Sequence, residues 1–210
     1  MTAAETAQRL DFWFDFASTY SYLASTRISS LAAKANVAVR FRPFLLGPIF
    51  KAQGWDSSPF NLYPVKGRHM WRDLERLAVD LGIPFCRPDP FPQNSLLAAR
   101  VAVAGLRQGW GEDFSIAVFR AEFAESCRID EAATLTAILS SLGIDAKAAL
   151  YAAQSDDNKL RLRAQTEEAQ RLGIFGAPSF TTEGGELFWG NDRLEQALAW
   201  AKRTERLPRA

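Results

Sequence analysis

The sequence predicts an α/β protein built on a mixed β-sheet, and three observations support this prediction. An aromatic run, LDFWFDF at residues 10–16, is followed by a helical pattern and then by a second strand-like run at residues 37–46. Strand signals return near the C-terminus, at residues 179–182 and 186–189, before a last amphipathic helix. Helical periodicity dominates the chain between these two groups. The expected order is therefore β-α-β, a helical insertion and β-β-α.

The N-terminal elements follow from hydrophobic patterning. Residues 10–16 form an apolar, aromatic run bounded by turn-forming residues, which is typical of a buried strand. One helix is expected from Tyr20 to about Lys34, with Asn36 near its end. Apolar side chains alternate with others in the next run, VAVRFRPFLL, which predicts a second strand until Pro43 limits further pairing.

The middle of the chain is expected to be mainly helical. Residues 47–64 are rich in Gly, Pro, Ser and Asn, and are predicted to form an irregular loop whose aromatic side chains favour packing over disorder. Helical patterns follow at residues 65–81, 95–108, 112–125, 130–141 and 157–172. These helices make up the predicted insertion.

The C-terminal elements complete the sheet. Glu183-Gly184-Gly185 is expected to turn a hairpin between the last two strands, and Asn191 or Asp192 to cap the final helix. The full order is typical of a thioredoxin-like sheet interrupted by helices. Residues 1–46 and 174–210 are accordingly predicted to form a thioredoxin-like domain, and residues 47–173 a helical insertion domain.

Composition and charge argue against several classes of protein. With 25 Lys and Arg against 24 Asp and Glu, the net charge of +1 provides no basic surface for nucleic acid or for anionic membranes. The start of the chain, MTAAETAQRL, has no apolar core of signal-peptide length, and no later run reaches the ~18 apolar residues of a membrane span. A cytoplasmic protein without nucleic-acid or membrane partners is therefore expected.

Cysteine and histidine offer little chemistry of their own. Cys86 and Cys127 lie far apart and form no C-x-x-C or zinc-ligand spacing, so reduced thiols are expected. His69 is the single histidine, which leaves the chain without a histidine-based metal cluster or a clear Cys/His pair. No metal site is predicted.

Hydroxyl side chains gather where the first strand meets the first helix, at Ser18, Thr19 and Ser21. The first turn of a helix leaves backbone N–H groups without intrahelical partners and carries positive potential. This junction is therefore a candidate site for an anionic group.

A family resemblance rests on five segments, taken in order along nearly the whole chain: FDFASTYSYLA, PVKGRHMWRDLERL, FPQNSLLAARVA, GIFGAPSF and FWGNDRLE. Together they resemble the 2-hydroxychromene-2-carboxylate isomerase family, which is related to kappa-class glutathione transferases and to the DsbA-like branch of the thioredoxin superfamily. DsbA-like redox enzymes carry C-x-x-C at the turn where this chain has Ser18-Thr19-Tyr20-Ser21, so dithiol exchange is not available there. The family often has Pro where Thr19 stands, a departure that bears on the rigidity of the turn.

The resemblance implies that the missing sulfur comes from glutathione as a cofactor. Ser18, with the N–H groups of the helix start, would donate to the glutathione thiolate and lower its pKa, which makes Ser18 the catalytic candidate. The alternative is that Ser18 only caps the helix. Ala177 would pair with the cysteinyl backbone of glutathione, and Pro178 would follow a cis peptide bond; the alternative is a trans proline at a strand edge.

The resemblance also places residues around the ends of glutathione. Asn191 and Asp192 match the positions that hold the carboxylate and the ammonium of the γ-glutamyl end, and Asp192 as a plain N-cap is the competing interpretation. Lys66 matches a family lysine that could face the glycyl or the substrate carboxylate, although exposed lysines are usually only solvated. Asn61 is a further polar contact. The roles of three more candidates for the pocket lining stay open: Trp55, His69 and Asn94.

The function that the resemblance implies is a glutathione-dependent cis-trans isomerase. It would interconvert 2-hydroxychromene-2-carboxylate and trans-o-hydroxybenzylidenepyruvate, in aromatic hydrocarbon catabolism, by reversible thiolate addition. Its partners would be glutathione, an aromatic unsaturated keto acid and a second copy of the chain in a homodimer. Two alternatives remain: a kappa-class-like glutathione S-transferase, which would consume glutathione, and a non-catalytic thioredoxin-fold binding module, in which serine at the turn would mark lost chemistry.

Overall fold

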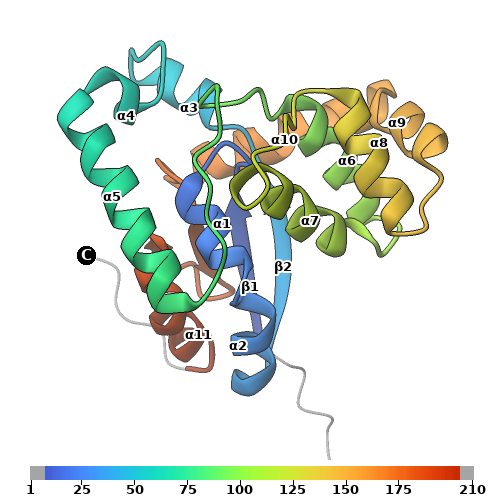
Figure 1. Cartoon of the computed structure of the whole chain (residues 1–210). Helices are drawn as coiled ribbons and strands as arrows, with labels where there is room; N and C mark the ends of the chain where they lie inside the picture. Colours follow the sequence, from blue (N-terminus) through green and yellow to red (C-terminus); the bar gives the residue numbers. More distant parts are fainter. Residues whose placement is uncertain (1–7, 204–210) are drawn as a thin grey trace, which may run out of the picture.

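A four-stranded mixed sheet lies at the centre of the computed structural model, which describes residues 8–203 (Figure 1). The strands are β1 (Gln8–Phe14), β2 (Val37–Pro43), β3 (Ser179–Thr182) and β4 (Leu187–Trp189), in the order β2-β1-β3-β4. β1 pairs in parallel with β2, whereas β1 with β3 and β3 with β4 are antiparallel. This topology confirms the predicted thioredoxin-like β-α-β and β-β-α halves. The predicted domain ends, residues 1–7 and 204–210, lie outside the described residues.

Helices cover the sheet and extend well beyond it. In Figure 1, α5 stands on one side of the centre and α6 to α9 lie on the opposite side. None of the helices in residues 8–203 has the length and apolarity needed to cross a membrane. The helices are α1 (Thr19–Ser25), α2 (Ile28–Ala35), α3 (Leu46–Ala52), α4 (Pro59–Leu62), α5 (Pro64–Leu81), α6 (Leu96–Leu106), α7 (Gly111–Phe123), α8 (Ala132–Ser141), α9 (Ala146–Ala153), α10 (Asp156–Arg171), the 3-10 turn η1 (Asn191–Arg193) and α11 (Leu194–Ala201).

The single helix predicted from Tyr20 to Lys34 is wrong, because the chain breaks it into α1 and α2. Ser25 Oγ donates to the Tyr22 carbonyl at 2.8 Å, and Thr26 Oγ1 donates to the Leu23 carbonyl at 2.8 Å. Hydroxyls that bond back to the preceding turn compete with the helical ladder and bend it. Arg27 therefore sits at a corner between the two helices, with φ −129° and ψ −15°.

The irregular loop predicted for residues 47–64 is also wrong, since this segment contains most of α3 and all of α4. The start of α3 is held from far away, because the Leu46 N–H donates to the Asp15 carboxylate at 2.7 Å. α4 begins locally, where Ser58 Oγ accepts from the Phe60 N–H at 3.3 Å and proline occupies the first helical position.

Two smaller differences concern α9 and the last helix. α9 was not among the predicted helices; it starts where Asp145 Oδ1 accepts from the Ala148 N–H at 3.0 Å. The last helix begins as the turn η1, and neither Asn191 nor Asp192 caps it: the residues before η1 and α11 are Gly190 and Arg193, without side-chain capping bonds. The other predicted strands and helices are found within a few residues of their expected bounds.

The main core joins the sheet directly to the helices. Every second side chain of β1 points to the same face, and Phe12 and Phe14 on that face are fully buried. Phe12 stands edge-on to Phe41 of β2 at 5.3 Å between ring centroids, and Phe14 lies 5.5 Å from Phe119 of α7. One hydrophobic cluster therefore runs from the sheet into the middle of the helical region.

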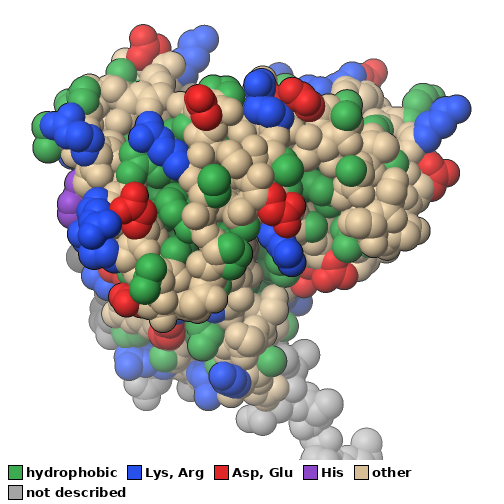
Figure 2. Space-filling model, viewed as in Figure 1, with side chains coloured by type: hydrophobic (Ala, Val, Ile, Leu, Met, Phe, Trp, Pro, Cys, Tyr) green, Lys and Arg blue, Asp and Glu red, His purple; other side chains and the backbone are tan. Residues whose placement is uncertain are grey.

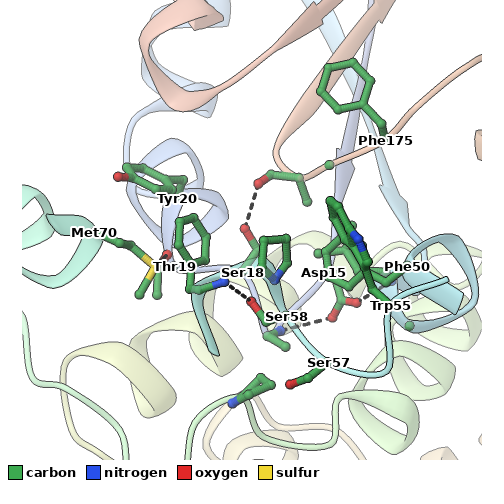
Figure 3. Close-up of a pocket in the computed structure, with 18 of the residues that line it drawn as sticks. Asp15, Ser18, Thr19, Tyr20, Phe50, Trp55, Ser57, Ser58, Met70 and Phe175 are labelled. Atoms are coloured by element: carbon green, nitrogen blue, oxygen red, sulfur yellow. Dashed lines mark hydrogen bonds between the residues drawn. The ribbon is translucent and has the colours of Figure 1, made fainter. Parts of the chain in front are cut away.

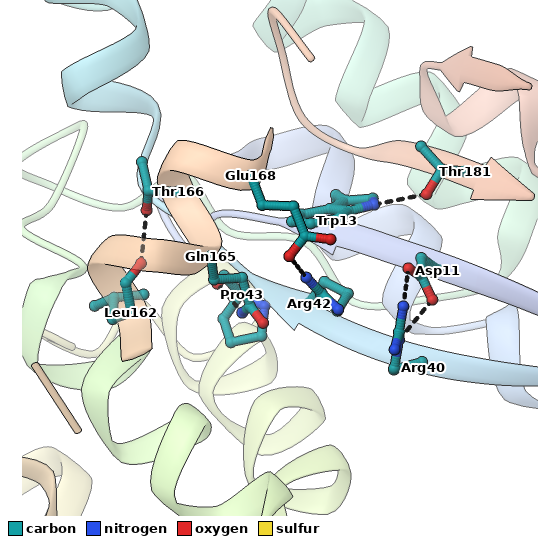
Figure 4. A network of polar contacts seen from close by, with 10 residues as sticks. All are labelled: Asp11, Trp13, Arg40, Arg42, Pro43, Leu162, Gln165, Thr166, Glu168 and Thr181. Atoms are coloured by element: carbon teal, nitrogen blue, oxygen red, sulfur yellow. Dashed lines mark hydrogen bonds and ion pairs between the residues drawn. The ribbon is translucent and has the colours of Figure 1, made fainter. Parts of the chain in front are cut away.

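The opposite face of the sheet carries Trp13 and a set of polar contacts with α10 (Figure 4). Trp13 Nε1 donates to Thr181 Oγ1 of β3 at 2.9 Å, and the Arg42 guanidinium lies 4.3 Å from the centroid of the Trp13 ring. Arg42 also forms an ion pair with Glu168 of α10. These contacts fix α10 over the sheet and leave the C-terminal end of β1 open toward α3 and α5.

Candidate functional site

A cavity of about 1960 Å³ opens at the C-terminal end of β1. Its walls come from the turn between β1 and α1, from α3 and the segment after it, from α5, from residues 91–96, and from the segments 175–177 and 189–193. Figure 2 shows hydrophobic side chains in the surface between α5 and the centre of the molecule, with charged side chains around them. The predicted chemistry-bearing turn thus meets the helical insertion at this cavity.

Ser18 lies in the wall of this cavity, at the N-cap of α1 (Figure 3). Its hydroxyl oxygen accepts from the Ser21 N–H at 3.3 Å, and its hydroxyl donates to the Ala177 carbonyl at 2.9 Å. The Ala177–Pro178 peptide bond is cis, as the family resemblance implied. Ser18 is therefore both a helix cap and the neighbour of residue 177, although 159 positions separate the two in sequence.

Asp15 holds the turn between β1 and α1 in place through hydrogen bonds. Its buried carboxylate accepts from the Ala17 N–H at 3.0 Å, from Ser95 Oγ at 2.6 Å and from the Leu46 N–H at 2.7 Å. Burial raises the pKa of Asp15, and the three hydrogen bonds oppose this effect. Asp15 was not among the predicted site residues, although an acidic side chain inside the run FWFDF was a signal for it. Asp15 ties the turn to the starts of α3 and α6.

A second buried carboxylate, Glu122 of α7, lies near enough to Asp15 for the charge of Asp15 to affect its pKa. Glu122 is fully buried, and neither of its carboxylate oxygens has a hydrogen-bond partner among the described residues. Burial, and then the charges of Asp15 and Asp130, raise its pKa well above the ordinary value. The interior therefore holds a carboxyl group whose ionisation is unfavourable.

Asn191 and Asp192 meet the cavity from η1. Asn191 is only 6% exposed, and its backbone carbonyl and side-chain Oδ1 accept from Arg27 Nη2 at 2.9 and 3.1 Å. Asp192 is exposed and pairs with Arg193 at 2.9 Å. Gly190 before them has φ 110°, a backbone conformation that residues with a side chain rarely adopt. The tight turn that presents these two side chains therefore needs glycine.

The opposite wall carries Tyr20 and α5. The Tyr20 hydroxyl donates to Asp73 Oδ2 of α5 at 2.9 Å, and burial together with this hydrogen bond raises the pKa of Tyr20. Lys66, in the first turn of α5, lines the cavity and lies 5.1 Å from the centroid of the Tyr63 ring. This wall is therefore polar as well as aromatic.

The cavity brings together most of the predicted site residues but not all of them. Asn61 is not part of the lining; its Nδ2 donates to Ser57 Oγ at 3.3 Å and to the Phe91 carbonyl at 3.5 Å. Pro178 is also outside the lining, although its neighbour Ala177 belongs to it. Sequence reasoning missed the pair Phe175 and Trp189, whose ring centroids lie 4.9 Å apart at the exposed rim. The lining includes Ser18, Trp55, Lys66, His69, Asn94, Ala177, Asn191 and Asp192.

Residues 9–199 match the DsbA-like thioredoxin domain family. Among relatives, the 2-hydroxychromene-2-carboxylate isomerase of Pseudomonas putida is 32% identical over 88% of this chain and 90% of its own length. The enzyme of the same name from Sphingobium xenophagum is 29% identical over 89% and 94%. Glutathione S-transferase kappa 1 of Caenorhabditis elegans is 25% identical over 95% and 93%.

Solved structures agree with these relationships. A 2-hydroxychromene-2-carboxylate isomerase structure superposes with a TM-score of 0.82 at 30% identity, and covers 91% of this chain and 93% of its own. A probable DsbA oxidoreductase from Streptomyces coelicolor shares the fold, with a TM-score of 0.74 at 20% identity over 94% and 92%. With its DsbA-like domain, its serine turn and relatives that align over nearly their whole length, the chain belongs to the 2-hydroxychromene-2-carboxylate isomerase family and is an isomerase of that family.

Proposed function

We propose that the enzyme is a glutathione-dependent cis-trans isomerase that interconverts 2-hydroxychromene-2-carboxylate and trans-o-hydroxybenzylidenepyruvate. The observation that carries this proposal is the position of Ser18, whose hydroxyl lies at the start of α1, in the cavity wall and 2.9 Å from the Ala177 carbonyl. A hydroxyl in this place can donate to a thiolate that the chain does not contain. The relatives named for this isomerisation support the choice of substrate.

The lining residues fit the chemical groups of glutathione. Ala177 offers backbone groups to the cysteinyl residue, Asn191 and Asp192 suit the γ-glutamyl carboxylate and ammonium, and Lys66 suits a carboxylate of the glycyl end or of the substrate. The cavity of about 1960 Å³ has room for a tripeptide and a bicyclic acid together. Asn61, on α4 behind the lining, would contribute through a change in its own hydrogen bonds.

When bound, glutathione would supply a thiolate. Once the hemiketal ring of the chromene opens to the keto form, this thiolate would add to the carbon-carbon double bond conjugated with the ketone, so that the bond becomes single, can rotate and re-forms when the thiolate leaves. The Ser18 hydroxyl would then donate to the sulfur instead of to the Ala177 carbonyl, because a hydroxyl hydrogen rotates to suit its acceptor. The backbone N–H groups at the start of α1 add to this stabilisation. Lys66 would stabilise the negative charge that develops on the ketone oxygen during addition.

A kappa-class-like transferase is the second candidate, and the relationship to glutathione S-transferase kappa 1 favours it. The two reactions differ in the fate of the cofactor. An isomerase returns glutathione unchanged, whereas a transferase consumes one molecule in each turnover. The homodimer and the cytoplasmic location expected from the sequence stay predictions.

The test is an ultraviolet-absorbance assay of chromene carboxylate with and without glutathione, with free thiol measured during turnover. Ser18→Ala should raise the pKa of bound glutathione, read from thiolate absorbance across pH, and should lower the isomerisation rate more than it lowers glutathione affinity. Ser21→Ala is the matched control, because Ser21 is fully buried one turn further along and its hydroxyl has no partner among the described residues. Equal titration curves and equal rates for Ser18→Ala and wild type would refute the role of Ser18.

A further inference from the structure

Arg27 reaches from the corner between α1 and α2 to the turn that carries Asn191. Its Nη2 donates to both the backbone carbonyl and the side-chain Oδ1 of Asn191, at 2.9 and 3.1 Å. Its Nη1 forms an ion pair with Glu195 in the first turn of α11. Arg27 is not among the residues that line the cavity, so it stands behind Asn191 as seen from a ligand.

The contact fixes which way the Asn191 amide faces. A guanidinium group has donors only, so the amide atom that meets it must be the oxygen. The amide NH₂ must then point away from Arg27, and it has no hydrogen-bond partner among residues 8–203. Asn191 is 6% exposed and lines the cavity, so its amide NH₂ is the group left to donate to a ligand there.

We propose that Arg27 is a positioning residue that sets the polarity of the Asn191 amide, and so makes the site selective for a ligand with an α-amino-acid end. Asn191 then offers a donor for a carboxylate, while Asp192 in the next position offers an acceptor for an ammonium group. With the amide reversed, two acceptors would face the ligand and the carboxylate would be repelled. The inference deepens the proposed function, because it rests on glutathione as the ligand, whose γ-glutamyl residue carries these two groups.

A direct electrostatic attraction between Arg27 and the ligand is not the basis of this role. Glu195 pairs with the same guanidinium, and the Arg27 side chain is 19% exposed, so its positive charge is largely balanced behind the turn. The role assigned to Arg27 is therefore geometric. The helix break at Thr26 matters for this role, because the corner that it creates places the Arg27 guanidinium next to η1.

The experiment compares two ligands by calorimetric titration. One is glutathione, and the other is 4-aminobutyryl-cysteinylglycine, which lacks only the α-carboxylate of the γ-glutamyl residue. Arg27→Met removes the donors and keeps an unbranched side chain; it should weaken glutathione binding about ten- to a hundred-fold, the range for one hydrogen bond to a charged group. Binding of the truncated ligand should change less than two-fold. Arg27→Lys keeps a charged donor and should restore part of the glutathione affinity.

Two further variants separate positioning from general stability. Glu195→Gln removes the ion pair but not the contact with Asn191, and should change glutathione affinity less than two-fold. In an Asn191→Ala background, Arg27→Met should cause no additional loss, because the group that it positions is absent. Thermal unfolding of each variant shows whether the protein is folded during the titrations.

The outcomes distinguish this inference from the proposed function. If the wild-type enzyme does not bind glutathione, the proposed function fails. If the wild type binds glutathione but Arg27→Met leaves its affinity unchanged, or weakens both ligands equally, only the role of Arg27 is overturned. If Arg27→Met does not fold, Arg27→Lys decides: equal changes for the two ligands overturn the inference, and a loss confined to glutathione supports it.

Discussion

Replacing Glu122 with Gln is expected to make the stability of the protein less dependent on pH. In the unfolded chain this carboxyl ionises near its ordinary pKa of 4.5, whereas burial raises its pKa well above that value in the folded protein. Between the two pKa values the folded state binds more protons than the unfolded state. The contribution of Glu122 is therefore fully present below the unfolded pKa and is lost as pH rises toward the folded pKa.

The size of the pH effect on stability follows from the binding of a single proton by Glu122. A single group can change the free energy of unfolding by at most about 1.4 kcal/mol for each pH unit. In Glu122→Gln this slope disappears, because the amide does not titrate. The two proteins should be equally stable in acid, where Glu122 is protonated, and the variant should become the more stable one as pH rises. Burial also raises the pKa of Asp15, so the slope that Asp15 contributes, of the same sign, remains in both proteins.

The assay is urea unfolding, followed by far-ultraviolet circular dichroism, at intervals from pH 4 to pH 9. Glu183→Gln is the matched control, because Glu183 is exposed in the turn between β3 and β4. The control should run parallel to the wild type. A Glu122→Gln curve that also runs parallel to the wild type, with no gain in relative stability at high pH, would refute the reasoning.

Three further predictions concern the turn and the cavity. Asp15→Asn places an NH₂ group opposite a donor such as the Leu46 N–H, so the free energy of unfolding should fall by about 1–3 kcal/mol, the cost of an unpaired buried group; equal urea midpoints and slopes would contradict this. Asp192→Ala should weaken glutathione binding by about 1.5–3 kcal/mol, measured by calorimetry, and unchanged affinity would remove Asp192 from the site. Replacing Cys86 and Cys127 together with Ser should leave glutathione-dependent activity largely intact; lost activity in a folded double variant would argue against an imported thiol.

Local patterns in the sequence predicted most of the sheet and the longer helices. The strand Val37–Pro43 and the helix Pro64–Leu81 carry their periodicity within their own residues, so no distant information is needed. The start of α3 could not be predicted in this way, since its first N–H binds Asp15, which lies 31 positions earlier. The break at Thr26 was equally hidden, because the same hydroxyl side chains occur inside unbroken helices.

In the candidate site, too, the sequence predicted some residues and not those whose roles depend on distant partners. The family resemblance assigned Ser18 and Ala177 to contacts with the same ligand, and the structure has the two residues in contact. The acidic residue inside FWFDF marked Asp15 as unusual, but the roles of Asp15 and Arg27 could not be assigned, because they depend on partners that are far away in sequence. Glu122 left a signal that was not used: it follows the buried residues Val118 and Phe119 at helical spacings of four and three, which places it on the buried side of α7.

The aromatic contact between the sheet and α7 bears on how the molecule unfolds and how it can evolve. Phe14 and Phe16 lie 5.5 and 5.0 Å from Phe119 in ring centroids, so the strand that leads to Ser18 shares its packing with a helix of the insertion. Parts that share one interior melt together. A substitution that destabilises α7 therefore also lowers the fraction of molecules in which the Ser18 turn is folded. If the insertion is exchanged between relatives, the aromatic residues that pack between β1 and α7 have to be exchanged with it.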